Sequence, residues 1–233
     1  MRSIPDNLQA VKARIAGAAR AAGRDPAAVA LLAVSKTHPP ALIEEAFRAG
    51  QSAFGENYVQ EALDKMTSLV QLPIEWHLIG PLQSNKTRAV AERFQWVHTV
   101  DREKVARRLS EQRPQALPPL DVLLQVNVSG EASKSGVAPR EVAALAKAVA
   151  GLPRLRLRGL MAVPEPTGDK GRQRARFREV RELYESLKKE GLELDTLSMG
   201  MTADMEAAIA EGSTMVRIGT AIFGERQKVK DAA

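Results

Sequence analysis

The chain has 233 residues, of which 44% are hydrophobic and 27% are charged. This length can bury one substantial core, and the composition is that of a globular protein, which argues against a disordered or membrane-spanning class. The sequence contains no cysteine, so it excludes disulfides and thiolate ligands, and we expect no metal site. Residues 27–34, the longest apolar run, are too few to span a membrane. Because the first residues lack the apolar core of a signal peptide, we expect one cytoplasmic domain over residues 1–233.

Basic residues outnumber acidic ones by 34 to 28, and the net charge of +6 invites the hypothesis of a nucleic-acid partner. The basic stretch at residues 171–190 argues against it. Opposite charges stand four residues apart there, as in Arg178 and Glu182, while Phe177 and Val180 share an apolar stripe. That pattern is typical of a solvated helix covering a core. Without an aromatic platform for bases, we expect neither a nucleic-acid nor a membrane partner.

The hydrophobic pattern predicts an opening helix over residues 5–22, and then short apolar runs that alternate with longer amphipathic segments. This alternation occurs eight times, with no change in composition that would mark a linker. The apolar runs predict strands over residues 29–35, 52–55, 74–79, 96–100, 120–128, 155–161, 194–198 and 214–218. Helices are predicted to begin near residues 40, 57, 84, 101, 139, 169 and 202, several at a capping residue or an early proline.

Eight strand and helix units in about 230 residues are typical of an α/β protein with a single (β/α)8 TIM barrel. Here the barrel would carry an extra N-terminal helix. In such a barrel the functional site lies at the carboxyl ends of the strands. A doubly wound open sheet shares the same alternation and is the structural alternative.

Polar side chains stand where the predicted strands end. Lys36 follows the first strand, Asn57 follows the second, and His77 lies near the end of the third. A lysine at the rim of a barrel is partly desolvated, which favours the neutral amine that attacks an aldehyde. The competing interpretation of Lys36 is a solvated lysine that closes a strand. For Asn57 and His77, a role in lining the site and a purely structural role both stay open.

The segments after the seventh and eighth strands predict a phosphate site. Ser198, Gly200 and Thr202 follow the seventh strand, and Gly219 and Thr220 follow the eighth. Glycine lets backbone approach a ligand, hydroxyls donate hydrogen bonds, and the loops after these two strands are the usual phosphate cradle of the barrel. Taken separately, each segment is equally consistent with turn glycines and a helix cap. Their combination favours a bound phosphate.

Several longer motifs occur in the order found in one protein family. They are Ala33-Val-Ser-Lys36, Phe54-Gly-Glu-Asn-Tyr58, Trp76-His-Leu-Ile-Gly-Pro-Leu-Gln-Ser-Asn-Lys86, Ser198-Met-Gly-Met201 and Val216-Arg-Ile-Gly219. On these motifs the chain resembles, over nearly its whole length, the pyridoxal phosphate homeostasis protein family. That family is similar to the N-terminal barrel of alanine racemase.

The resemblance implies a cofactor, pyridoxal 5'-phosphate, bound as a Schiff base to Lys36. It also implies phosphate contacts from four residues, which are Ser198, Thr202, Gly219 and Thr220. Arg217 would face the pyridine nitrogen, where a permanent positive charge disfavours protonation and makes the ring a poorer electron sink. A salt bridge at the barrel rim is the alternative for Arg217. Lys134 either adds positive charge near the phosphate or belongs to a flexible surface loop.

Such a site is compatible with a racemase or with a cofactor carrier. A racemase needs a second acid–base group opposite Lys36, which a tyrosine from an added domain of a partner subunit supplies in racemases of similar fold. The sequence ends shortly after Gly224, so we expect no such domain here, and Tyr58 and His77 are the local substitutes. We therefore expect a monomeric carrier or regulator that binds pyridoxal phosphate reversibly, without turnover, in intracellular homeostasis. Its expected partners are the cofactor and pyridoxal-phosphate-dependent apoenzymes.

Overall fold

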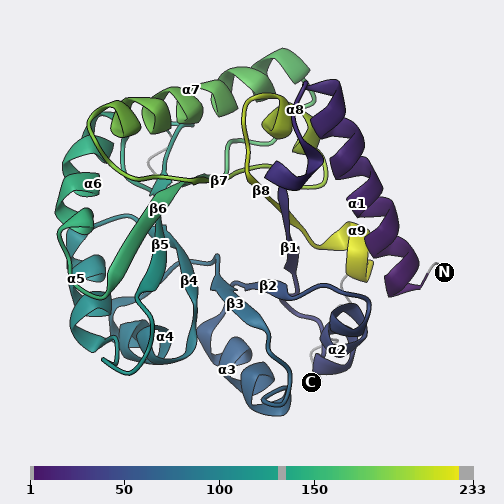
Figure 1. Ribbon diagram of the computed structural model, residues 1–233, viewed down its shortest axis with the longest axis horizontal. Helices are drawn as coiled ribbons and strands as arrows, with labels where there is room; N and C mark the ends of the chain where they lie inside the picture. Colours follow the sequence, from purple (N-terminus) through teal and green to yellow (C-terminus); the bar gives the residue numbers. More distant parts are fainter. Residues whose placement is uncertain (1–2, 131–134, 226–233) are drawn as a thin grey trace, which may run out of the picture.

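The computed structural model describes residues 3–130 and 135–225. Over these residues, eight parallel strands form one closed barrel in the order β1 to β8, and β8 pairs with β1. Figure 1 shows the ring of strands at the centre with helices around it. The strands are β1 (Ala30–Val34), β2 (Ala53–Glu56), β3 (Glu75–Leu78), β4 (Trp96–Val100), β5 (Leu120–Val126), β6 (Leu155–Ala162), β7 (Thr196–Ser198) and β8 (Met215–Ile218). The predicted barrel is confirmed, and the open-sheet alternative is wrong.

The outer layer is helical. Its α-helices are α1 (Ile4–Ala21), α2 (Pro40–Arg48), α3 (Val59–Ser68), α4 (Thr87–Arg93), α5 (Glu103–Gln112), α6 (Val142–Ala150), α7 (Lys170–Lys189), α8 (Met205–Ala210) and α9 (Thr220–Phe223). Short 3-10 turns are η1 (Pro26–Ala28), η2 (Ser84–Lys86) and η3 (Pro139–Glu141). The helix starts predicted near residues 84 and 139 therefore fall on 3-10 turns that lead into α4 and α6.

β5 is shorter than the sequence predicts, because the chain leaves the sheet two residues early. The backbone N–H of Asn127 donates to the Val137 carbonyl at 3.0 Å, and the Val137 N–H donates to the Gln125 carbonyl at 2.8 Å. These bonds pair the end of β5 with the segment before α6. An apolar residue at position 128 is thus buried without belonging to the strand.

α1 fills the outer position next to the last strand of the barrel. The helix that follows β8 is the short α9, and α1 packs against α8, α9 and α2. Figure 1 shows α1 beside α8 and α9. A capping box between Ser3 and Asp6 starts the helix. Its buried stripe consists of Ile4, Leu8, Val11, Ile15 and Ala19. The extra N-terminal helix is confirmed, and it completes the outer layer.

The barrel interior contains a polar network. The imidazole of His98, on β4, lies 3.0 Å from the hydroxyl of Ser198, on β7. These strands are not neighbours in the sheet, so the contact crosses the interior. His77 on β3 and Arg217 on β8 extend the network. Trp96 stacks on His77 and belongs to a small apolar cluster with Leu123 and Met161.

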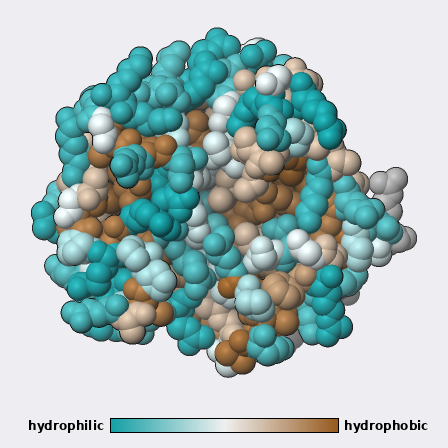
Figure 2. Space-filling view, viewed as in Figure 1, coloured by the Kyte–Doolittle hydropathy of each residue, from teal (hydrophilic) through white to brown (hydrophobic). Residues whose placement is uncertain are grey.

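The visible surface is mostly hydrophilic. In Figure 2, hydrophilic residues cover most of the outer helices, and apolar residues gather over β1, between β8 and α1. Among the described residues, no helix combines the length and the apolar character that crossing a membrane requires.

Gly159 is predicted to be indispensable for the pairing of β6 with β7. Its φ is +152°, and a Cβ there would lie 1.8 Å from the Thr196 carbonyl oxygen. We expect Gly159→Ala to lower the free energy of unfolding by about 2–4 kcal/mol in urea denaturation. Gly17→Ala is the matched control, because Gly17 lies in α1 with nothing near its Cβ position. That variant should gain about 0.5–1 kcal/mol. Equal effects of the two substitutions would contradict the steric argument.

Candidate functional site

One cavity lies where the barrel fold predicts a site, at the carboxyl ends of the strands. Its volume is about 370 Å³. The lining residues are Val34, Lys36, His38, Asn57, Ile79, Val163, Met201, Thr202, Ala203, Arg217, Gly219 and Thr220. They come from β8 and from the ends of β1, β2, β3, β6 and β7. We call this the rim cavity.

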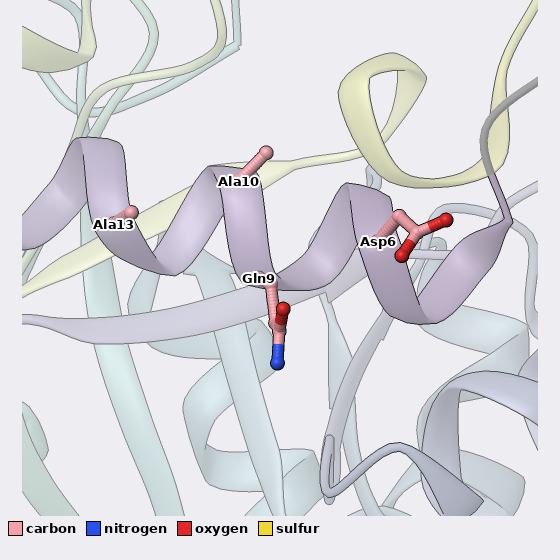
Figure 3. Close-up of a pocket in the computed structure, with 4 residues that line it drawn as sticks. All are labelled: Asp6, Gln9, Ala10 and Ala13. Atoms are coloured by element: carbon pink, nitrogen blue, oxygen red, sulfur yellow. The ribbon is translucent and has the colours of Figure 1, made fainter.

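A larger recess, of about 610 Å³, lies on the outside of the molecule. It is lined by Asp6, Gln9, Ala10 and Ala13. Figure 3 shows that all four come from α1 and that Gln9 and Ala10 point in opposite directions. Its two polar side chains, Asp6 and Gln9, do not point toward one another, so this recess lacks the converging polar groups of a binding site.

Lys36 lies two residues beyond β1, half-buried in the wall of the rim cavity. The turn that carries it has an unusual backbone, since Thr37 has a φ of +65° without being glycine. The N–H of Thr37 donates to the Glu61 carboxylate at 2.6 Å, and the Ser35 hydroxyl donates to Glu56 at 2.6 Å. Both neighbours of Lys36 are therefore fixed by side chains from other segments.

A buried lysine holds these two carboxylates together. The ammonium of Lys65, on α3, donates to Glu56 at 2.8 Å, to Glu61 at 2.6 Å and to the Ser35 carbonyl at 2.8 Å. Burial raises the pKa of Glu56, and the attraction of Lys65 opposes that rise. An ion pair this deeply buried contributes geometric definition more than net stability. The cluster of Ser35, Glu56, Glu61 and Lys65 thus fixes the turn that presents Lys36.

The loops after β7 and β8 bring Thr202, Gly219 and Thr220 to the rim cavity. A Cβ on Gly219 would lie 3.0 Å from the Val34 carbonyl oxygen, so a larger residue would press on the end of β1. The loop after β7 is tied to β8, because the Arg217 N–H donates to the Gly200 carbonyl at 3.0 Å. The two loops therefore form one wall.

α1 supports this wall from outside. The Arg14 guanidinium donates to the Thr202 carbonyl at 2.9 Å and also pairs with Glu206 on α8. The Asn7 amide donates to the Ile222 carbonyl in α9 at 2.9 Å. Both loops are thereby fastened to the same helix, which orients their hydroxyl-bearing residues.

Arg217 is buried in the floor of the rim cavity. One terminal nitrogen donates to the Ser198 carbonyl at 2.6 Å and to the Ser198 hydroxyl at 2.8 Å, and the other donates to the Ala162 carbonyl at 2.9 Å. Burial lowers the pKa of Arg217 to about 10, and Asp204 partly offsets this. The guanidinium is therefore still charged at neutral pH.

Asn57 lines the cavity, and one polar atom of its side chain is buried without a partner. Its Oδ1 is buried and has no hydrogen-bond partner among the described residues. Its backbone lies very close to Gly80, where a Cβ would come within 2.1 Å of the Asn57 carbonyl oxygen. The position of Asn57 thus depends on glycine in the loop after β3. Leaving a buried acceptor without a donor costs free energy, so Asn57 Oδ1 is a point of unsatisfied polarity beside the cavity.

Six of the eight predicted site residues meet in the rim cavity, and two do not. His77 and Ser198 are fully buried in the barrel interior and do not line the cavity. Lys134 lies outside the described residues. His38, which the sequence reasoning did not assign to the site, lines the cavity and stacks against Phe223 with ring centroids 5.0 Å apart. Its place two residues after Lys36 was the available signal.

The rim cavity combines one primary amine, one buried guanidinium and two threonine hydroxyls. Cationic groups and hydroxyls bind phosphate oxygens, and a primary amine reacts with an aldehyde. The arrangement therefore suits a small phosphorylated ligand that carries a reactive carbonyl.

Comparisons with known proteins agree with this chemistry. Residues 7–227 match the family model described as alanine racemase, N-terminal domain. The chain is 64% identical over 226 residues to a Pseudomonas aeruginosa protein named pyridoxal phosphate homeostasis protein, with 97% of each covered. A protein of the same name from Escherichia coli K12 is 55% identical over 233 residues, with 99% of this chain and 100% of the relative covered.

Solved structures give the same result. PipY of Synechococcus elongatus PCC7942, solved with PLP bound, has a TM-score of 0.84 and 36% identity, covering 95% of this chain and 100% of that chain. D-threonine aldolase from Filomicrobium marinum has a TM-score of 0.75 and 22% identity, with 94% of this chain matched to 60% of that chain. At that identity the likeness shows the fold alone. The chain therefore belongs to the alanine racemase N-terminal domain family and, within it, to the pyridoxal phosphate homeostasis proteins.

Proposed function

We propose that this protein binds pyridoxal 5'-phosphate in the rim cavity, holds it as a reversible Schiff base on Lys36, and takes part in cofactor homeostasis. One observation carries the proposal: the amine of Lys36 and the guanidinium of Arg217 line one cavity together with Thr202 and Thr220. The names of the relatives, and the PipY structure with PLP bound, support the choice of ligand.

The residues of the cavity have two functions: one forms the covalent bond to the cofactor, and the others bind its phosphate. The Lys36 nitrogen bonds to the aldehyde carbon with release of one water, and addition of water reverses the step, so the ligand is held without being consumed. Thr202 and Thr220 donate hydroxyl hydrogen bonds to the phosphate, and Gly219 lets the backbone approach it. Asn57, which lines the cavity, contributes to the wall against which the ligand lies.

In the proposed complex Arg217 faces the pyridine nitrogen of the cofactor. When bound, the cofactor supplies an electron-accepting ring, and it accepts electrons best with a protonated ring nitrogen. A charged guanidinium in the floor of the cavity disfavours that proton. Burial lowers the pKa of Arg217 only to about 10, so its charge persists at neutral pH. Arg217 thus favours holding the cofactor over using it.

The carrier is favoured over the racemase because a second acid–base group is hard to find. Tyr58 does not line the cavity and is 58% exposed. His77 is fully buried and hydrogen-bonded to Glu75 and His98. His38 is the histidine that lines the cavity, so it is the group that a racemase hypothesis would have to use.

Two residues that the sequence predicts to contact the cofactor, Ser198 and His77, have a different part in this proposal. Ser198 and His77 support Arg217 from below and do not touch the cofactor themselves, because both are buried and already hydrogen-bonded. We further propose that the protein works as a cytoplasmic monomer and that pyridoxal-phosphate-dependent apoenzymes receive the cofactor. The homeostasis function in the names of its relatives supports such recipients.

Lys36 is predicted to be the covalent attachment point. Borohydride reduction of the protein loaded with pyridoxal phosphate should fix the cofactor to the peptide that contains Lys36, as measured by mass spectrometry. Lys36→Ala should lose the Schiff-base absorbance and retain the cofactor at least about tenfold more weakly. Lys86→Ala is the control, because this exposed lysine lies outside the cavity. Attachment to another residue, or unchanged absorbance in Lys36→Ala, would refute the tether.

The two threonines are predicted to recognise the phosphate specifically. A hydrogen bond to a charged group contributes about 1.5–3 kcal/mol, so Thr202→Ala combined with Thr220→Ala should weaken pyridoxal phosphate binding by about 100-fold or more. Binding of pyridoxal, which lacks the phosphate, should hardly change. Thr67→Ala, on the exposed face of α3, serves as control. Equal losses for both ligands would exclude these hydroxyls from the phosphate site.

The carrier proposal predicts an absence of turnover. In deuterated water, the loaded protein incubated with single amino-acid enantiomers should give no sustained exchange at Cα, as measured by proton NMR. Exchange that continues over many turnovers would favour the racemase. If that exchange disappeared in His38→Gln, His38 would be identified as its acid–base group.

A further inference from the structure

A continuous row of hydrogen bonds runs through the barrel interior and ends at the rim cavity. Glu75 Oε1 lies 2.8 Å from His77 Nε2, and His77 Nδ1 lies 2.9 Å from His98 Nε2. His98 Nδ1 lies 3.0 Å from the Ser198 hydroxyl, to which Arg217 donates at 2.8 Å. We call these five residues the interior relay. It joins the opposite end of the barrel to the guanidinium in the cavity floor.

The Glu75 carboxylate at one end, together with two neutral imidazoles, assigns the protons in the relay. Arg217 is only a donor, and the hydrogen bond from His77 lowers the pKa of Glu75, so this carboxylate is an acceptor. The Ser198 hydroxyl therefore donates to Nδ1 of His98, whose Nε2–H donates to Nδ1 of His77. The Nε2–H of His77 then donates to Glu75. In this arrangement both histidines are neutral and carry their proton on Nε2.

The surroundings keep the histidines neutral. Both are fully buried, and burial lowers the pKa of His77 and lowers that of His98 well below its ordinary value. Glu75 and Asp121 favour protonation of His77, whereas His77 and Arg217 both oppose protonation of His98.

Stacked side chains cover His77, the member of the relay next to Glu75. Trp96 stacks on His77 with ring centroids 5.3 Å apart, and the Arg158 guanidinium lies 4.6 Å from the centroid of the Trp96 ring. Glu75 is the member that reaches solvent, with 49% of its side chain exposed. Hydrogen bonds in such a dry interior strengthen one another, and an unmade one is costly.

We propose that the interior relay positions Arg217, so that His98 and His77 control the electronic state of the bound cofactor without touching it. Because Nδ1 of His98 accepts the hydrogen bond from the Ser198 hydroxyl, the hydrogen of that hydroxyl points away from Arg217 and a lone pair of its oxygen is left to accept from the guanidinium. The guanidinium is then held at three points, the Ser198 hydroxyl, the Ser198 carbonyl and the Ala162 carbonyl. This inference rests on the proposed function only in the clause that Arg217 faces the cofactor ring.

The first test uses the protein without ligand, so it does not depend on the proposed function. The chain has three histidines, and ¹⁵N NMR with His77→Gln and His98→Asn as assignment variants resolves them. Between about pH 6.5 and pH 8, His77 and His98 should both stay neutral with the proton on Nε2. A proton on Nδ1 of either residue, or an imidazolium in this range, overturns the relay.

The second test measures the effect on the ligand, with pyridoxal phosphate labelled with ¹⁵N at the ring nitrogen. His98→Leu removes the acceptor for the Ser198 hydroxyl. This variant should retain the cofactor about tenfold more weakly, and the pKa of the cofactor's ring nitrogen should rise by about one unit. His98→Asn keeps an acceptor near the place of Nδ1 and should recover both properties.

Ser198→Ala provides a second route to the same result, since it removes one hydroxyl and is measured if His98→Leu fails to fold. Unchanged retention and unchanged ring titration in the altered protein overturn the positioning role. Loss of retention without a change in ring titration also overturns it, because a merely structural defect has that effect. Failure of wild-type protein to form a Schiff base contradicts the proposed function instead, and the ligand-free test then still decides the relay.

Discussion

The pairing of the first strand with the last is the constraint on which the rest of the structure depends. β1 and β8 run parallel, with Leu32 opposite Arg217 and Ala33 opposite Ile218. This register places the residues that follow the two strands side by side, so Lys36 shares a wall with Gly219 and Thr220. Because every strand points the same way, all loops that follow strands gather at one rim. Closure of the sheet thus creates the cavity.

Much of the fold was predictable because burial leaves a periodic trace in the sequence. The eight apolar runs identify the strands, and the buried stripe of α1 identifies the added helix. Strand ends were less predictable, because they depend on which group forms a hydrogen bond with each backbone N–H and carbonyl. β7 begins two residues later than predicted, and at Leu194 the backbone carbonyl accepts a side-chain hydrogen bond, from the Tyr184 hydroxyl at 2.9 Å. Hydropathy carries no information about such a choice.

Site residues that directly follow a strand were predictable from the sequence. It was less predictable whether a residue within a strand lies at the cavity or deeper in the barrel interior. His77 lies within β3, and Ile79 lies just beyond its end, about 7 Å further along the chain direction, so Ile79 lines the cavity and His77 does not. Lys65 could not be foreseen, because a lysine on an amphipathic helix normally faces water. Its burial becomes apparent only when Glu56 and Glu61 approach it in three dimensions.

The bonds that α1 makes to the rim have a consequence for how the molecule assembles. Asn7 and Ile222 are 215 positions apart in the sequence, and Arg14 and Thr202 are 188 apart. These two contacts nevertheless fasten the segments after β7 and β8 to α1. Contacts at such separation form late, because the entropy of closing a long loop opposes them until the intervening segments have folded. Until these contacts form, the loops after β7 and β8 lack their attachment to α1. The protein would therefore become able to bind the ligand only late in folding, after α1 has packed against the segments that follow β7 and β8. Measuring ligand binding during refolding would then show when this packing is complete.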